Sequence, residues 1–316
     1  MTTADWTRPG IPVRHERPVR RGHGPGLVLA LLASALVGCS GPAAPSTPRR
    51  RAAGSVSTPP VEIHGSAKAP TPPPAISRTI LPADPNRPTS EIGVLQIDPH
   101  QVRLRLLAGS LEPAGAHGDG MVPATDRPVA LAAFNSGFEM SQSRGGWYSE
   151  GVTAVPLRPG AASLVLRSDG TADVGTWGLD VSMGPTVTAV RQNLTLLIDK
   201  GAPTTFASAA DFEGLWGKTI HHLAAVSRSG IGITASGKLV YLAGTGLLVG
   251  DLVGALLRAG AQRAMELDIN PQFVDAYTYA PGSAGPIGLP LVPSLRYGPS
   301  HYLQPQARDF IEVLAR

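Results

Sequence analysis

The chain has 316 residues, of which 42% are hydrophobic and 16% charged, and its formal net charge is +4 at neutral pH. The positive balance lies in the first 75 residues, which carry 9 Lys and Arg against 3 Asp and Glu, whereas the remainder carries 18 against 20. A body with a net charge of about −2 gives no reason to expect a nucleic-acid partner, and its length suffices for a sizeable core.

Residues 1–38 have the layout of an export signal. A basic stretch precedes an apolar run at 27–37, which ends at Gly38-Cys39. The run has about a dozen residues, fewer than the roughly 20 that span a bilayer, so we expect its removal after export. The junction Leu36-Val37-Gly38-Cys39 resembles the bacterial lipoprotein signal, whose cysteine carries the lipid. The sequence therefore predicts an exported protein anchored through Cys39 to the outer face of the cytoplasmic membrane, with an unlipidated leader as the alternative.

Residues 39–75 are rich in Pro, Ala and Ser and contain almost no large apolar side chain. Such a segment cannot bury enough surface to offset its ordering entropy, which predicts a disordered stalk. Cys39 is the only cysteine, so no disulfide forms within the chain. Residues 76–316 follow without a second linker and are expected to form one domain.

Strand patterns dominate residues 76–316. Gly and Pro are abundant, large aromatic residues are sparse, and turn signals adjoin several short apolar runs. These runs lie at 92–97, 102–106, 129–134, 164–166 and 194–198. The pattern predicts an α+β fold, with a mixed and largely antiparallel β-sheet core and a few packed helices.

The stretch 227–271 predicts a strand, strand, helix, strand unit. Apolar residues alternate with small or polar ones on both sides of a Gly-containing turn at 235–238, which is typical of a hairpin of two half-buried strands. Leucine and valine then recur at helical spacing over 248–257, Asp251 lies in the first turn, and Gly260 follows as a stop. A last strand at 265–268 ends before Pro271.

Two carboxylates, Glu266 and Asp268, lie at i and i+2 of that last strand, so their side chains are expected on one face with Cα atoms roughly 6.6 Å apart. Arg228 begins the first strand of the unit. An acid pair beside an arginine can bind a phosphorylated sugar and protonate its leaving group. The same residues can also form a structural ion pair.

Polar residues and aromatic rings follow two earlier strands. Asn135 ends an apolar run within Phe134-Asn135-Ser136-Gly137-Phe138, where its amide can either face a ligand or cap an Asx turn. Trp147 and Glu150 lie in a Gly-rich loop, and an aromatic face beside a carboxylate suits a sugar ring. The alternative for Trp147 is a hydrophobic plug over the core.

No metal site and no cofactor are predicted. The adjacent pair His221-His222 would point to opposite faces of a strand, and no further Cys or His stands at ligand spacing.

Taken in order, these motifs resemble the phosphodiester glycosidase family, which includes the N-acetylglucosamine-1-phosphodiester alpha-N-acetylglucosaminidase-like domain. The resemblance spans about 128–279. It rests on the turn at 135–138, the arginine-led strand at 228–232, the hairpin and helix, and Leu267-Asp268-Ile269-Asn270 at the end of the last strand.

The resemblance implies hydrolysis of a glycosyl 1-phosphodiester in cell-envelope or extracellular glycans, with release of the terminal sugar. Asp268 would act as the catalytic carboxylate, and Glu266 would orient Arg228 or act as a second acid. Arg228 and Asn135 would hold the phosphodiester, with Glu150 and Trp147 also contacting the substrate.

The chain departs from the family pattern at two places. Ser136 replaces the first glycine of the turn, which is a mild change if the backbone angles there are ordinary. Ile269 begins a segment that replaces a glycine run, and its branched side chain is expected to narrow or reshape the site. This departure favours an alternative function, an envelope lipoprotein that binds glycan or phosphoglycan without cleaving it. A groove closed over Asp268 would support that alternative.

The predicted anchor can be tested by substituting its cysteine. Cys39→Ala should leave the protein unprocessed or release it from the membrane fraction, because no other cysteine can accept the lipid. Fractionation and mass spectrometry of the N-terminus measure both outcomes. Native protein that retains Met1 in the cytosol would contradict the prediction.

Overall fold

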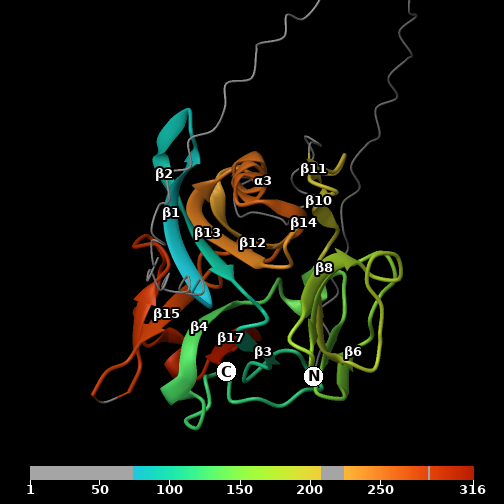
Figure 1. The fold of residues 1–316 in the computed structure, drawn as a ribbon, viewed down its shortest axis with the longest axis vertical. Coiled ribbons are helices and arrows are strands. Elements are labelled where there is room, and N and C mark those ends of the chain that lie inside the picture. The colour runs from blue at the N-terminus through green and yellow to red at the C-terminus, as the bar shows by residue number, and fades with distance from the viewer. Residues whose placement is uncertain (1–73, 208–223, 284) are drawn as a thin grey trace, which may run out of the picture. The chain divides into compact units, whose positions relative to one another are not determined.

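The computed structural model describes residues 74–207, 224–283 and 285–316. The predicted leader, most of the predicted stalk and His221-His222 lie outside the described residues. Within the described part, every strand of the three sheets pairs with its neighbours in antiparallel fashion (Figure 1). This confirms the predicted α+β class with a largely antiparallel core. None of the described helices is long and apolar enough to cross a membrane.

The first sheet has seven strands in the order β1-β2-β13-β12-β14-β10-β11. Its hairpin is the predicted one, since Ile231 pairs with Tyr241 and Ile233 with Leu239 across the turn. The strands are β1 (Ile76–Asp84), β2 (Arg87–Ile97), β10 (Leu196–Asp199), β11 (Ala202–Pro203), β12 (Val226–Thr234), β13 (Leu239–Leu247) and β14 (Ala261–Glu266).

The helix α3 (Val249–Arg258) lies over β12, β13 and β14 (Figure 1). The Leu248 N–H donates to Asp251 Oδ2 at 2.8 Å, and Gly260 has a φ of +88° just after the helix, as the sequence predicts for its two ends. Because α3 covers the outer face of the sheet, Val240 and Leu242 are buried as fully as Ile231 and Tyr241. The hairpin strands are therefore buried on both faces, and the prediction of half-buried strands was wrong.

The other two sheets have five strands each, in the orders β16-β15-β4-β17-β3 and β6-β5-β9-β7-β8. The second sheet consists of β3 (Val102–Leu107), β4 (Ala130–Asn135), β15 (Ala276–Ala280), β16 (Ile287–Pro290) and β17 (Phe310–Ala315). The third consists of β5 (Trp147–Ser149), β6 (Val152–Val155), β7 (Ala162–Arg167), β8 (Ala172–Thr176) and β9 (Val187–Gln192). Among the described residues, short helical segments between strands are η1 (Arg127–Val129), α1 (Met140–Ser143) and η3 (His301–Leu303).

The largest apolar cluster takes side chains from all three sheets, including Tyr241 of the first, Phe134 of the second and Leu164 of the third. The Phe134 and Tyr241 rings lie 4.4 Å apart between centroids. Asn135 follows Phe134 directly, so the polar residue at the end of β4 lies at the border of the core where the sheets meet.

We expect α3 to contribute substantially to stability through Leu252, which is fully buried against the sheet. Leu252→Ala should lower the free energy of unfolding by about 2–5 kcal/mol, because it leaves a cavity as well as removing apolar contact. Urea titration measures the change. The exposed Val152 supplies a control, and Val152→Ala should change stability by less than about 0.5 kcal/mol.

Candidate functional site

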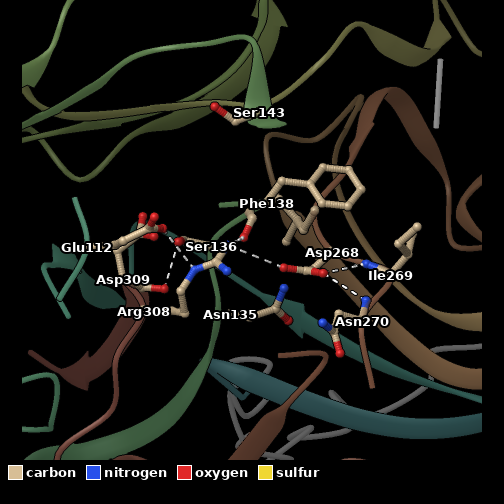
Figure 2. A network of polar contacts seen from close by, with 12 residues as sticks. Glu112, Asn135, Ser136, Phe138, Ser143, Asp268, Ile269, Asn270, Arg308 and Asp309 are labelled. Carbon is tan, nitrogen blue, oxygen red and sulfur yellow. Dashed lines mark hydrogen bonds and ion pairs between the residues drawn. The ribbon is translucent and has the colours of Figure 1, made fainter. Parts of the chain in front are cut away.

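Ser229 of β12 joins two of the predicted site residues. Asn135 Nδ2 donates to Ser229 Oγ at 2.9 Å, and the Asp268 N–H donates to the same oxygen at 3.1 Å. Asn135 Oδ1 in turn accepts the Tyr241 hydroxyl at 2.6 Å. The end of β4 and the segment after β14 are thereby held against β12. Asn135 and Asp268 consequently lie close together although they are 133 positions apart in the sequence (Figure 2).

The Asp268 carboxylate is oriented by its own following backbone. Its Oδ1 accepts the N–H groups of Ile269 and Asn270 at 2.7 and 2.8 Å, while Oδ2 lies 3.7 Å from Arg308 Nη2 (Figure 2). Burial raises the pKa of Asp268 to about 6, against the opposing effect of these N–H donors and Arg308. One oxygen is therefore fixed, and the other is directed toward a guanidinium.

Arg308 was not among the predicted site residues. Its Nε lies 3.1 Å from Glu112 Oε2, its guanidinium lies over the Phe273 ring at 4.5 Å, and its Nη2 donates to Gly137 O at 3.4 Å. These three contacts fix the guanidinium beside Asp268. The sequence contains little indication of this role, because Arg308 appears there only as part of an Arg-Asp pair just before the last strand.

The neighbour of Arg308, Asp309, lies in a buried ion pair. Arg191 Nε of β9 contacts Asp309 Oδ2 at 2.7 Å, and Trp147 Nε1 donates to the same oxygen at 3.1 Å. Ser136 Oγ donates to the Asp309 carbonyl at 2.9 Å. Trp147 is 3% exposed, so its ring forms part of the core around Asp309, as in the alternative interpretation of that residue.

Asn193 holds the Asn135 turn against the end of β14. Its Nδ2 donates to the carbonyls of Glu266 and Leu267 at 2.7 and 3.0 Å, and its Oδ1 accepts the Phe138 N–H at 3.1 Å. Asn193 was not predicted as a site residue, because an asparagine that follows Arg191-Gln192 has no local signature for bridging two distant loops.

Arg228 and Glu266 form a second buried pair, with Nη1 and Oε1 2.6 Å apart. Arg228 also donates to the carbonyls of Leu247 and Ala224 at 3.0 and 3.3 Å. Burial raises the pKa of Glu266 to about 7, and the adjacent Arg228 opposes that rise. Among the described residues, no hydrogen bond or ion pair joins Arg228 to Asp268, so the guanidinium is engaged by Glu266 and backbone carbonyls.

The remaining predicted residues lie elsewhere or face inward. Glu150 follows β5 with a φ of +49° and pairs with Arg105 at 3.4 Å, on a cleft that does not include Asp268. Ser136 does not have a positive φ, so its replacement of a family glycine is mild as expected. Ile269 packs in the apolar cluster beneath α3, so its branched side chain points into the core rather than narrowing the site.

The space beside Asn135 and Arg308 is small. A cavity of about 20 Å³ is lined by residues that include Asn135, His301, Arg308 and Asp309, and Asp268 itself is 2% exposed. A cavity of this size holds about one water molecule. The site is therefore closed over Asp268.

No protein family model matches the chain, and no curated protein matches it. Among solved structures, the chain is similar to the catalytic domain of zebrafish N-acetylglucosamine-1-phosphodiester alpha-N-acetylglucosaminidase, which is auto-inhibited by its pro-peptide. The TM-score is 0.51 at 17% identity, over 77% of this chain and 84% of that one. The likeness shows a shared fold. A hypothetical protein from Synechocystis aligns with a TM-score of 0.45 and 15% identity, over 72% of this chain and 59% of that chain.

The raised pKa of Asp268 predicts a pH-dependent stability. Since the folded state holds this proton more tightly than the unfolded state, the stabilisation is complete below about pH 4 and is lost as the pH rises through about 6. Asp268→Asn should flatten the dependence of the unfolding free energy on pH in this range, because the amide does not titrate and its oxygen can still accept the two N–H groups. Urea titrations between pH 4 and 7 measure the unfolding free energy.

Asp119→Asn is the matched control, because Asp119 is exposed and the same chemical change is made there. A profile for Asp268→Asn as steep as that of Asp119→Asn would contradict the pKa assigned to Asp268.

Proposed function

We propose that the protein hydrolyses a glycosyl 1-phosphodiester of the cell envelope or extracellular medium and releases the terminal sugar. The observation that carries the proposal is the Asp268 carboxylate, whose Oδ2 is directed toward Arg308 while Oδ1 is fixed by two backbone N–H groups. The fold shared with the zebrafish enzyme domain supports the same reaction class.

In the proposed reaction, the bond between the anomeric carbon and the phosphate oxygen breaks. The bonding electrons leave with the phosphate monoester, and water supplies the hydroxyl group to the anomeric carbon. Positive charge develops on the sugar in the transition state, and the ionised Asp268 stabilises it or accepts the proton from water. With a pKa of about 6, this carboxylate is mostly ionised at neutral pH.

Arg308 takes the phosphate-binding role that the sequence assigns to Arg228. Its planar guanidinium can donate in bidentate fashion to the departing phosphate, with Asn135 beside it. Arg228 is instead a positioning residue, because Glu266 and two carbonyls occupy its guanidinium. Arg228 and Ser229 are neighbours on β12, so the contacts of Arg228 help to hold Ser229 in place. Glu266 orients Arg228, as the sequence analysis allows.

A second candidate function is favoured by the closure of the site. Asp268 is 2% exposed and the adjoining cavity measures about 20 Å³, which is too small for a sugar. A protein closed in this way would bind glycan or phosphoglycan at its surface without cleaving it, because no sugar could reach Asp268. Hydrolysis requires Arg308 and Phe273, which line the small cavity, to shift when substrate binds.

Activity measurements separate the two functions. The full chain should release free sugar from at least one methyl diester in a panel of sugar 1-phosphates. Asp268→Asn should lower kcat about 10²–10⁴-fold, because the amide carries no charge and is not a base. Arg308→Lys should also lower kcat, since an ammonium cannot reproduce the guanidinium fork.

Asp119→Asn should leave turnover unchanged and serves as the control. Calorimetry with the same diesters completes the test. Binding without sugar release by the wild-type chain would support the second candidate, and unaltered turnover in Asp268→Asn would exclude Asp268 as the catalytic carboxylate.

A further inference from the structure

A separate cleft of about 660 Å³ runs along β3, between the second and third sheets. Four arginines line it, Arg103 and Arg105 from β3, Arg167 from the end of β7 and Arg316 after β17, against two carboxylates. The side chains that line the cleft therefore sum to a formal charge of +2, whereas the side chains beyond residue 75 sum to about −2. Positive charge is concentrated in a concave surface of an otherwise slightly acidic body.

The four arginines differ in how far neighbouring carboxylates neutralise them. Arg105 lies 2.6 Å from Asp126, 3.4 Å from Glu150 and 3.6 Å from the buried Glu312. Arg103 reaches Asp126 at 3.5 Å. By contrast, the Arg167 guanidinium makes no hydrogen bond or ion pair with any described residue, although the pKa of the exposed Asp169 in the same turn is lowered by hydrogen bonds from Thr171 and also by the Arg167 charge. The Arg167 end is therefore the part of the cleft where no carboxylate contacts a guanidinium directly.

Arg316 is seated at that same end by the shape of the β7–β8 turn. Its Nε donates to Val102 O at 3.0 Å, which leaves its other N–H groups available. Gly170 of the turn has a φ of +83°, and a Cβ at this position would collide with Arg316 Nη2. Gly170 also donates its N–H to Arg167 O at 3.2 Å. The β7–β8 turn therefore lies beside both arginines, since Arg167 precedes it in the chain and Arg316 packs against it from the second sheet.

The remaining wall of the cleft offers groups that suit sugar hydroxyls. Residues 102–106 of β3 line it, and β3 pairs with β17 on one side only. The Val102 and Leu106 carbonyls accept hydrogen bonds from Arg316 and Ser149, which leaves the backbone of Leu104 between them as the group that can meet a hydroxyl. The hydroxyls of Thr125 and Ser168 make no hydrogen bond with described residues and also line the cleft. No aromatic ring lines it, which disfavours stacking of nucleobases.

We propose that this cleft binds an acidic saccharide chain, with its carboxylate or phosphate groups on Arg167 and Arg316 and its hydroxyls along β3. This site does not depend on the proposed hydrolysis at Asp268, since the two share no lining residue. A charge-assisted hydrogen bond from a guanidinium to either kind of anion is stronger than a neutral one. Affinity should therefore fall as ionic strength rises.

The proposal is tested by calorimetry on the full chain at low salt with four probes. An oligogalacturonate carries carboxylates, a phosphorylated maltooligosaccharide carries phosphates, maltohexaose is neutral, and inorganic phosphate lacks the sugar. At least one acidic oligosaccharide should bind, and the neutral one should not. The stronger of the two acidic probes identifies the anion that the cleft prefers.

Three variants at the cleft and away from it sharpen the test. Arg167→Gln should weaken binding about tenfold or more with little change in the melting temperature, because its guanidinium makes no hydrogen bond or ion pair with a described residue. Glu150→Gln should strengthen binding, because it removes a carboxylate that competes for Arg105. Arg78→Gln removes the same charge from the exposed face of β1 and should leave affinity unchanged.

Several results would overturn the proposal. Maltohexaose could bind as strongly as the acidic oligosaccharides, or inorganic phosphate could bind as strongly as they do. The Arg167→Gln variant could have the same affinity as Arg78→Gln. Finally, neither acidic oligosaccharide could bind.

Discussion

The buried Arg191–Asp309 ion pair is the contact on which the arrangement of the site depends. It joins β9 of the third sheet to the start of β17 in the second, and neither side chain is exposed. Burying two charges is costly, and attraction compensates only when the remaining hydrogen-bonding groups are satisfied. Here Trp147 donates to Asp309, while Arg191 donates to the carbonyls of Gln192 and Phe138. Because Arg308 precedes Asp309 directly, the pair that joins the sheets also places the guanidinium beside Asp268.

Several other carboxyl groups are buried around this junction without full compensation. Burial raises the pKa of Glu266 to about 7, of Asp275 to about 8 and of Glu312 to about 7. The environments differ: Glu266 Oε1 pairs closely with Arg228, whereas Glu266 Oε2, Asp275 Oδ2 and both oxygens of Glu312 accept no hydrogen bond from the described residues. Raised carboxyl pKa values accumulate at functional sites and also in structural ion pairs. Arg228–Glu266 has the geometry of the structural case, whereas Asp268 Oδ2 accepts no hydrogen bond from the described residues and lies 3.7 Å from Arg308 Nη2.

Sequence periodicity was sufficient for the elements but not for the contacts between them. The β12–β13 hairpin and α3 were predictable because each is encoded by local spacing. The two-sided burial of the hairpin was not, since it depends on where α3 packs. The expected common face of Glu266 and Asp268 rested on the period of a strand, yet β14 ends at Glu266 and the Asp268 side chain is oriented by the N–H groups of Ile269 and Asn270. Arg308 lies 40 residues beyond Asp268, and the pairing of β17 with β4 together with the Arg191–Asp309 ion pair brings it to the site.

Ile269 and Ser136, the two positions at which the sequence differs from the phosphodiester glycosidase pattern, do not cause the closure over Asp268. The sequence suggested that Ile269 would narrow the pocket, but its side chain lies under α3 while its N–H performs the backbone role at Asp268 Oδ1. Ser136 likewise contributes a hydroxyl that binds the Asp309 carbonyl and so supports the loop of Arg308. Neither substitution fills the space in front of Asp268. That space is limited by Arg308 and Phe273, whose side chains stack on each other and are not substitutes for the family glycines. Closure therefore depends on a contact between two side chains and not on the backbone of the sheets, so it is separate from the two sequence differences.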